Sequence, residues 1–333
     1  MAAKLIHITD LYHPHNDPDD HYDLAQVFAL HKCGAIDLQH IIIDYPKMDD
    51  RWAPALASVY QLNDLTGSNI HVTLGADTRL YVGKPELWKT APAAHVHAAE
   101  IILDILKKSD EKVYITIVGG CLDTAMALER SPETFREKCA GIILNAGSGI
   151  PTAEKEWNVM LGLTEYSRIF DAPCPVFWNP CMHSMECWSG EFGTHYRFLQ
   201  KELWKKLSPG LLNYFLYVLT HSSNPLFLKV LNETPDPNAI EQFGELFRDM
   251  YCTGSIFDIA GKTVTTDGKI AEKGSVTNPV FEYRPVRVKP TPEGDTLWEY
   301  DASSSDRFIY CVNVPSCYDA AMAEALGDIL TNL

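Results

Sequence analysis

The sequence predicts an α/β protein with an open, mostly parallel sheet of Rossmann-like type, helices on both faces and a helical insertion. Two observations carry this prediction. Through about the first 180 residues, short β-rich runs alternate with segments whose apolar residues recur at helical spacing. Several of the short runs are apolar throughout, which is typical of strands that helices cover on both sides. The alternation favours right-handed βαβ units, because parallel strands need crossover connections.

The elements can be placed in order along the chain. The first strand is expected at residues 4–9 (KLIHIT), and the helix that follows it, at 21–34, ends at Gly34. Further strands are predicted at 38–43, 69–76, 112–120, 139–147 and 175–180, and helices at 53–67, 93–109 and from 123 onward. Because parallel strands end at one edge of a sheet, the loops after them should converge in space and bind the ligand there.

The second half of the chain has a different pattern. From about 185 to 250 it is helical and rich in aromatic residues, which predicts a helical insertion. Residues 276–289 and 307–314 are expected to be β structure, and residues 317–330 a closing helix. Without repeats or long linkers, we expect a single domain over residues 1–333.

Composition limits the partners and the compartment. The net charge of −16 argues against nucleic acid or an anionic membrane as a partner. No apolar run reaches the roughly 20 residues of a membrane helix, and the start MAAKLIHITD lacks a signal-peptide pattern. The nine cysteines are scattered, odd in number and follow no disulfide framework. These features predict a cytoplasmic protein with reduced thiols.

Aspartates are concentrated where the first predicted strand meets the first helix. Asp10 ends the strand, and Asp17, Asp19 and Asp20 precede or begin the helix. Helix capping accounts for one or two of them. Carboxylates that converge repel by about 4 kcal/mol per pair at ~4 Å and an effective dielectric near 20. No Lys or Arg lies between Lys4 and Lys32, so a bound cation is the expected counter-charge, and oxygen ligands favour Ca²⁺ or Mg²⁺.

The same stretch carries a resemblance to a known family. ITD at 8–10 with DPDDHYDLA at 17–25 resembles the N-terminal aspartate signature of the nucleoside hydrolase family, whose members include inosine-uridine preferring enzymes. Further matches follow in the family's order: IHVTLGAD (70–77), VGGCLDTAMAL (118–128), EWNV (156–159) and GSIFDIAG (254–261). The resemblance therefore spans nearly the whole chain, and it is weakest in the helical middle.

The resemblance implies a fold, an activity and a set of residue roles. It implies an open α/β sheet and a calcium-dependent hydrolase that cleaves the N-glycosidic bond of ribonucleosides or related ribosides and releases ribose. The implied Ca²⁺ ligands are Asp10, Asp20, Asp258 and the carbonyl of Leu122, with Asp10 also the catalytic general base. The implied substrate contacts are Asp19 at a ribose hydroxyl, Glu156 and Asn158 at the 5′ side, and Asn145 near the ribose.

The chain departs from the family's pattern at several positions. The first signature aspartate is Ile8, the first loop is longer, and Asp44 stands in for an asparagine after the second strand. Phe257 takes the place of a histidine that in several members protonates the leaving base. Two outcomes follow: a histidine near the first loop supplies the proton, or Phe257 offers a stacking face and only good leaving groups are released. The candidate histidines are His13, His15 and His21.

Other interpretations remain open at this point. The chain can be a metal- and sugar-binding family member with little turnover, or a Mg²⁺ phosphoryl-transfer enzyme, although it lacks an obvious basic phosphate clamp. We expect a homo-oligomer whose partner is a small-molecule nucleoside or riboside. Cys174, Cys181, His183 and Cys187 lie close in sequence, but their spacing is not one of the usual zinc patterns. Trp157, Trp178, Trp188 and Tyr251 are expected in the core, with one or two free to stack on a base.

Overall fold

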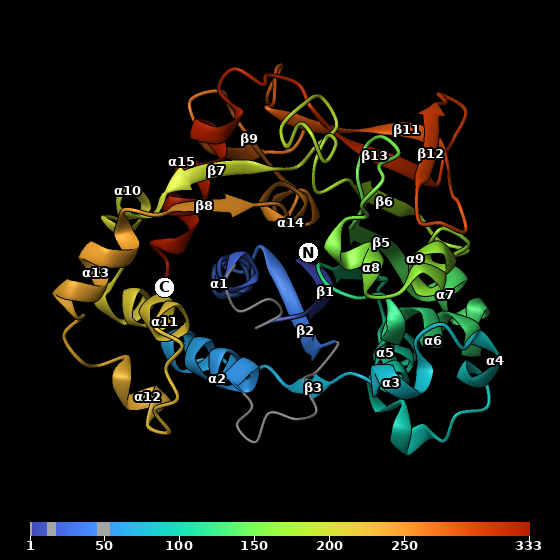
Figure 1. The fold of residues 1–333 in the computed structure, drawn as a ribbon, viewed down its shortest axis with the longest axis horizontal. Coiled ribbons are helices and arrows are strands. Elements are labelled where there is room, and N and C mark those ends of the chain that lie inside the picture. Colours follow the sequence, from blue (N-terminus) through green and yellow to red (C-terminus); the bar gives the residue numbers. More distant parts are fainter. Residues whose placement is uncertain (1, 12–17, 45–53) are drawn as a thin grey trace.

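A nine-stranded sheet forms the centre of the computed structural model, which describes residues 2–11, 18–44 and 54–333 (Figure 1). The strands of this sheet are β1 (Ala3–Thr9), β2 (Ile36–Ile43), β3 (Val72–Leu74), β4 (Val113–Ile117), β5 (Cys139–Asn145), β6 (Val176–Asn179), β11 (Phe281–Pro290), β12 (Thr296–Tyr300) and β13 (Arg307–Val312). Their order is β12-β11-β13-β6-β5-β4-β1-β2-β3. The predicted open, mostly parallel sheet is therefore confirmed.

The strand order fixes where a ligand can bind. From β13 to β3 every neighbouring pair runs parallel, and β11 and β12 add an antiparallel edge. The chain moves outward from β1 to β2 and β3, then returns to place β4 on the other side of β1. This reversal between β1 and β4 leaves a crevice at the carboxyl ends of the two strands, the usual ligand site of open α/β sheets.

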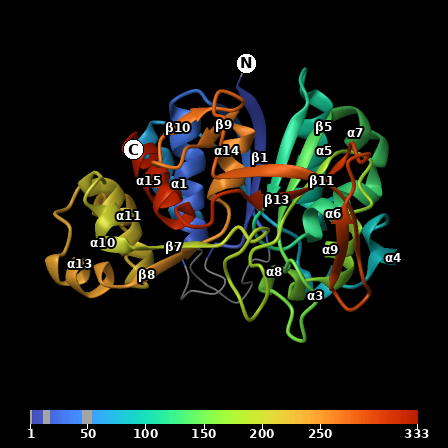
Figure 2. The same cartoon turned by 90° about the horizontal axis from the view of Figure 1, so that it is seen from above.

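Helices cover both faces of the sheet (Figure 2). Their apolar side chains pack against it in two clusters. One face carries α1 (Asp19–Lys32), α2 (Pro54–Thr66), α11 (Pro209–Leu219), α14 (Thr253–Ile259) and α15 (Tyr318–Leu330). The other carries α5 (His97–Lys108), α6 (Leu122–Arg130), α7 (Pro132–Lys138) and α9 (Leu163–Ile169), with the short α3 (Thr78–Tyr81), α4 (Pro85–Trp88) and α8 (Trp157–Met160) nearby. Two hydrophobic cores result, one on each side.

Helix α1 is unusual because residues 20–30 are all buried. It packs between the sheet and helices α2, α14 and α15, so it has no solvent face. Its polar residues Asp20, Asp23 and Gln26 repeat every three positions and therefore lie on one side of the helix. Gln26 Nε2 donates to the Thr253 carbonyl at 3.0 Å, which shows that this polar side faces the start of α14.

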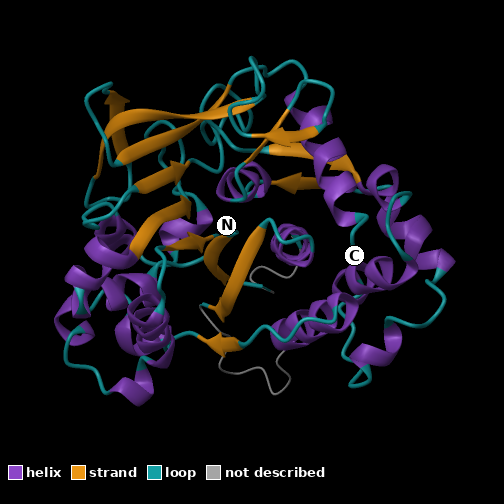
Figure 3. Ribbon diagram, turned by 180° about the vertical axis from the view of Figure 1, so that it is seen from behind, coloured by secondary structure: helices purple, strands orange, loops and turns teal. Residues whose placement is uncertain are grey.

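The segment predicted as a helical insertion contains strands as well as helices. It begins with β7 (Tyr196–Leu199) and ends with β8 (Phe247–Met250), which pair antiparallel as a separate small sheet. Between them lie α10 (Gln200–Trp204), α11, α12 (Phe227–Val230) and α13 (Pro237–Gly244). Figure 3 shows these helices gathered at one side of the molecule, away from the antiparallel edge of the main sheet.

A second small sheet joins β9 (Lys262–Val264) and β10 (Ile270–Glu272). No helix among the described residues combines the length and apolar character needed to cross a membrane.

Candidate active site

Buried carboxylates occupy the crevice between β1 and β4. Asp10 follows β1 and is 3% exposed, and Asp44 follows β2 and is 1% exposed. The loop after β4 approaches both of them, because a Cβ at Gly119 would lie 2.7 Å from Asp44 Oδ1 and 2.8 Å from Asp10 Cβ. A side chain at Gly119 would therefore displace a carboxylate, which explains why the chain turns here through glycine.

Burial and mutual repulsion disfavour the charged form of these acids. Burial, with a smaller contribution from the charges of Asp44 and Asp19, raises the pKa of Asp10 to about 8, although hydrogen bonds with Asp20 and Trp157 oppose the rise. Trp157 Nε1 donates to Asp10 Oδ2 at 3.2 Å. Burial and the charge of Asp10 also raise the pKa of Asp20, whose Oδ2 accepts from Thr9 Oγ1 at 3.2 Å.

The acidic group continues away from the cavity. Burial raises the pKa of Asp44, and the charges of Asp123 and Asp20 add to the rise. Burial raises the pKa of Asp123 to about 6, although its Oδ1 accepts from the Ala76 amide at 3.0 Å. Among the described residues, no lysine or arginine forms an ion pair with Asp10, Asp20, Asp44 or Asp123. The prediction that a counter-charge is needed at this strand end therefore rests on the burial of these carboxylates as well as on the sequence.

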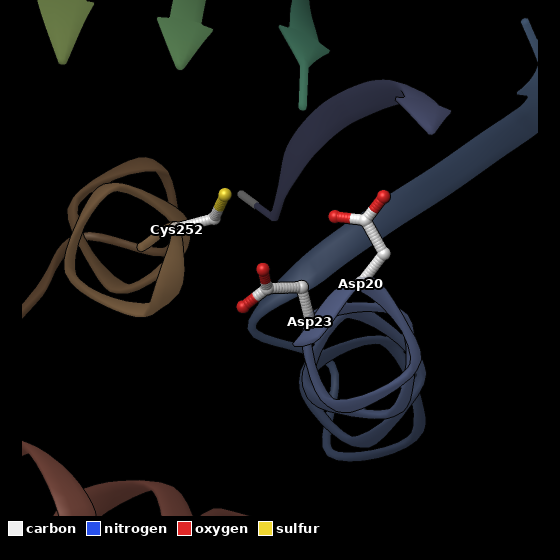
Figure 4. Close-up of side chains that lie close together, drawn as sticks. All are labelled: Asp20, Asp23 and Cys252. Atoms are coloured by element: carbon white, nitrogen blue, oxygen red, sulfur yellow. The ribbon is translucent and has the colours of Figure 1, made fainter. Parts of the chain in front are cut away.

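Asp20, Asp23 and Cys252 form the one group of possible metal ligands found among the described residues. One ligand atom from each lies within 4.8 Å of the others, and all three residues are buried. Asp20 and Asp23 lie one turn apart on α1, and Cys252 is the residue immediately before α14 (Figure 4). Burial raises the pKa of Asp23 to about 7, and the thiol of Cys252 and hydroxyl of Thr253 oppose that rise.

A cavity of about 610 Å³ opens beside these carboxylates. Its acidic wall consists of Asp10, Asp19 and Asp20. The remaining lining is largely aromatic or sulfur-containing: Trp157, Met160, Cys181, Met182, Met185, Trp188, Tyr251 and Cys252. Sequence reasoning expected the aromatic residues in the core. That holds for Trp178, which is fully buried, but Trp157 and Trp188 are 42% and 44% exposed and line the cavity with Tyr251.

Glu156 and Asn158 line the cavity, but their side chains form hydrogen bonds with backbone groups. Glu156 is the N-cap of α8 and accepts from the amides of Asn158 and Val159, while its Oε2 accepts from Gly147 at 2.7 Å. Asn158 Nδ2 donates to the carbonyls of Val118 and Asn145, both at 3.0 Å. These contacts fix the loop after β5 against the end of β4. The side chains of Glu156 and Asn158 reach the cavity from this loop.

Asn145 lies beneath the cavity rather than in its lining. It is fully buried at the end of β5, where its Nδ2 donates to the Tyr251 carbonyl at 3.2 Å. Its Oδ1 accepts from Asn179 Nδ2 at 3.0 Å. Asn145 therefore holds the Tyr251 backbone, and a direct contact with ribose stays a prediction.

The late motif at 254–261 is placed differently from the sequence expectation. Asp258 forms an ion pair with Lys273 at 2.7 Å, and Phe257 is fully buried in the hydrophobic core. Neither residue lines the cavity. Both stand more than one turn beyond the start of α14, where Cys252 faces Asp20 and Asp23. The structure therefore does not bring Asp258 together with Asp10 and Asp20, and it gives Phe257 no face toward a ligand, because the matched motif lies too far along the helix.

The other expected residues have distinct positions. Leu122 begins α6 with its side chain in the core, so only its carbonyl is available, and that role stays a prediction. His21 is buried on α1 near Tyr214, with ring centroids 6.0 Å apart, and does not line the cavity. His13 and His15 lie outside the described residues. His183 stacks on Phe192 at 4.1 Å between centroids, and it joins no group of metal ligands among the described residues.

The residues present fit calcium only in part. Asp10, Asp19 and Asp20 offer the carboxylate oxygens that hard cations prefer. The side of Asp20 that faces α14, however, presents the sulfur of Cys252 instead of another oxygen. Because thiols are soft ligands that hard cations do not use, this position departs from an all-oxygen calcium shell. Sequence reasoning missed Cys252, which lies two residues after β8 and immediately before α14.

No protein-family model matches the chain, and no curated protein matches its sequence. Solved structures, in contrast, match over nearly its whole length. A plant nucleoside hydrolase matches with a TM-score of 0.60 and 16% identity, covering 99% of each chain. The inosine-uridine preferring nucleoside hydrolase from Bacillus anthracis matches with a TM-score of 0.55 and 12% identity, covering 99% of this chain and 100% of the other.

A third match is the type III effector protein XopQ, solved in complex with adenosine diphosphate ribose. Its TM-score is 0.50 at 13% identity, and the match covers 99% of this chain and 94% of XopQ. At such low identities a structural likeness establishes the fold alone. The chain therefore has the α/β fold of nucleoside hydrolases.

Proposed function

We propose that this protein is a divalent-cation-dependent N-ribohydrolase that cleaves the N-glycosidic bond of ribonucleosides or related ribosides and releases ribose. One observation carries the proposal. Two nearly buried carboxylates, Asp10 and Asp20, open onto a cavity that the aromatic side chains of Trp157, Trp188 and Tyr251 also line. A sugar suits the acidic wall and a base suits the aromatic wall, so a riboside bound across the cavity has its scissile bond between them.

The chemistry of riboside cleavage favours such an acidic wall. The sugar carries positive charge as the N-glycosidic bond breaks, and carboxylates fixed in a buried site stabilise that charge. Asp10 is the proposed general base for the attacking water, a role that contributes ~10²–10⁴ in rate. The Trp157 indole donates to Asp10 Oδ2 and thereby holds the carboxylate toward the cavity. A divalent cation, when bound, would lower the pKa of a water and orient sugar hydroxyls.

Calcium is the cation that the resemblance implies, and the carboxylates of Asp10, Asp19 and Asp20 make it the first to test. We propose that Asp19 contacts a ribose hydroxyl, and that Glu156 and Asn158 approach the 5′ side. A site built around the 2′-hydroxyl leaves polar groups unpaired when that hydroxyl is absent. The enzyme is therefore expected to select ribosides over 2-deoxyribosides.

Release of free ribose tests the proposal. Inosine, uridine, adenosine and 2-deoxyuridine are incubated with the protein and Ca²⁺, Mg²⁺, Mn²⁺ or Zn²⁺, and reducing sugar and free base are quantified. Stoichiometric ribose and base from at least one riboside, abolished by chelator and by Asp10→Asn, support the proposal. Equal kcat/KM for uridine and deoxyuridine would remove the role of the 2′-hydroxyl. Inorganic phosphate release from phosphorylated substrates without ribose release would favour phosphoryl transfer instead.

A second candidate is a binding protein with little or no turnover. The cavity volume of about 610 Å³ leaves room for a ligand larger than a nucleoside, and XopQ was solved with adenosine diphosphate ribose. Calorimetry with adenosine diphosphate ribose separates the two functions. Saturable binding without any release of ribose or base would favour the binding protein.

We also propose a homo-oligomer in the cytoplasm. All nine cysteines are free thiols, which suits a reducing compartment. Exposed apolar side chains such as Leu226 (59%) and Phe247 (55%) lie on the segment between β7 and the start of α14. Light scattering after size exclusion tests the oligomer, and a monomer at micromolar concentration would contradict it.

A further inference from the structure

Helices α1 and α14 bring two carboxylates and a thiol together in the interior. Asp20 and Asp23 occupy the side of α1 that faces the start of α14, where Gln26 anchors the Thr253 carbonyl. Cys252 precedes Thr253 and is 2% exposed, and Asp23 is fully buried. Ligand atoms of Asp20, Asp23 and Cys252 lie within 4.8 Å of one another, and Figure 4 shows the carboxylate of Asp23 directed toward Cys252.

The carboxylate of Asp23 is an independent observation that points to a ligand at this contact. Neither Asp23 Oδ1 nor Oδ2 has a hydrogen-bond partner among the described residues, although both oxygens are inaccessible to solvent. A buried polar group without a partner is strongly destabilising, and a buried charge more so. The polar neighbours of Asp23 are the carboxyl of Asp20, the thiol of Cys252 and the hydroxyl of Thr253, and none of them carries a positive charge. A cation at this point would satisfy both carboxylates and the thiol.

The donor types identify the class of cation. Two carboxylates with a thiolate suit a borderline divalent metal such as Zn²⁺, whereas Ca²⁺ and Mg²⁺ take oxygen ligands. We infer that Asp20, Asp23 and Cys252 bind a zinc-class divalent cation, and that this cation, rather than calcium, is the one that the protein retains. Binding removes the thiol proton of Cys252 and releases it to solvent.

The position is reachable from the cavity. Asp20 and Cys252 both contribute to the cavity lining, whereas Asp23 lies behind them in the core. Three protein ligands leave a fourth position of a zinc-class cation open, as in catalytic zinc sites. The inference rests on the cation requirement of the proposed function and deepens it by naming the cation's class.

Cobalt titration of the full-length protein tests the inference without reference to activity. Chelator-treated protein is titrated with Co²⁺, and the sulfur-to-cobalt charge-transfer absorption is followed. Wild type should bind one Co²⁺ per chain with this absorption, Zn²⁺ should abolish it, and a large excess of Ca²⁺ should not. Asp23→Asn should weaken binding by at least roughly tenfold, since even loss of a group that only supports a ligand costs about 10- to 100-fold in affinity.

Two cysteine variants supply the matched comparison. Cys252→Ser should lose the charge-transfer absorption, while Cys181→Ser, whose thiol lines the same cavity outside the cluster, should keep it. Circular dichroism of each variant checks that it is folded; if Cys252→Ser does not fold, the wild-type titration and Cys181→Ser still decide.

Three results would overturn the inference: no absorption in wild type, absorption that Ca²⁺ removes, or absorption that depends on Cys181. With any of these, calcium-dependent ribose release would leave the proposed function standing. Zinc-class binding without ribose release would instead remove the proposed function and keep the metal site.

Discussion

The two walls of the cavity differ in chemistry and in how the chain builds them. The acidic wall comes from the end of β1 and the first turn of α1, two elements that adjoin in sequence and are held by the sheet. The aromatic wall comes from short or irregular segments: Trp157 on α8, Trp188 in the loop before β7, and Tyr251 after β8. The difference teaches that the sheet and its first helix set the acidic wall, to which we assign the sugar, whereas short helices and loops set the aromatic wall, to which we assign the base.

The largest expected effect comes from the acidic wall. Asp10→Asn should lower kcat for ribose release by ~10²–10⁴, because it removes the proposed general base while keeping the side chain's size. Steady-state kinetics with inosine or uridine measure the change. Asp258→Asn, a comparable substitution at a carboxylate outside the cavity, is the control. A kcat for Asp10→Asn within about threefold of wild type would mean that the acidic wall does not supply the base.

The dependence of the rate on the leaving group tests whether the aromatic side of the cavity contains a general acid. None of the described residues that line the cavity is a histidine, and Lys155 is paired with Asp295 at 2.6 Å. Without an acid, substrates whose leaving group needs no proton should be favoured, since a general acid contributes ~10²–10⁴. We expect kcat/KM for p-nitrophenyl riboside to exceed that for inosine by at least about 100-fold. Comparable values, with inosine turnover lost in His13→Ala or His15→Ala, would place an acid in the first loop.

Loss of a stacking surface should have a smaller effect that falls mainly on KM. A base stacked on an aromatic side chain gains ~1–3 kcal/mol, so Trp188→Ala or Tyr251→Ala should raise KM roughly tenfold. Tyr60→Ala, at an exposed position on α2, is the matched control and should leave KM unchanged. If both cavity variants keep the wild-type KM for every nucleoside, the base does not rest on this wall.

The pH dependence of the folding stability should differ between the cation-free and the cation-bound protein. In cation-free protein, Asp10, Asp23 and Asp123 keep their protons to pKa values of about 8, 7 and 6, whereas unfolded aspartates lose theirs near 3.9. The unfolded state then binds fewer protons between pH 4 and 8, so stability falls as pH rises. A cation that holds these carboxylates ionised in the folded state removes this fall.

Thermal unfolding at several pH values measures that difference. The gain in Tm on adding the cation should grow between pH 5 and pH 8. His7, whose pKa burial lowers to about 3, acts in the opposite sense: its loss of stability appears as pH falls below its unfolded pKa of about 6.5, and we expect it equally with and without the cation. A cation-induced Tm gain that stays constant with pH would contradict the account.

The smallest effect is expected at Asp258, which the family resemblance implies as a metal ligand but which forms an ion pair in the structure. Asp258→Asn breaks a pair with Lys273, whose side chain is 55% exposed. Such pairs contribute about 0–1 kcal/mol to stability, so Tm should change little and metal affinity should not change. A loss of bound metal in this variant would restore Asp258 to the ligand set.

The fold and the acidic wall could be predicted from sequence because both follow from local rules. Buried apolar strands alternating with helices define a parallel sheet, and Asp10 and Asp44 follow strands directly, so they had to meet at one edge. Asp19 and Asp20 begin the next helix and join them there. The short motif at 254–261, in contrast, could not fix which turn of α14 faces α1.

Sequence reasoning missed Cys252, and it did not distinguish Trp188 from the aromatic residues of the core. A helix register is set by packing against neighbours, and α14 is positioned by Gln26 and by Tyr196, whose hydroxyl lies 2.7 Å from Thr253 Oγ1. Those contacts join residues 57 or more positions apart, which no local pattern reveals. Trp188 lies in an irregular segment without periodicity, so nothing in its neighbourhood distinguished a core tryptophan from one that faces a ligand.

The division of the cavity into a sugar side and a base side is tested most directly by a crystal structure of Asp10→Asn with inosine and the retained cation. The account predicts ribose hydroxyls beside Asp19 and Asp20, and hypoxanthine against Trp157, Trp188 or Tyr251. It predicts no ligand density near Asp258. A base that contacts the carboxylates with the ribose against the aromatic wall, or a nucleoside bound outside this cavity, would contradict it.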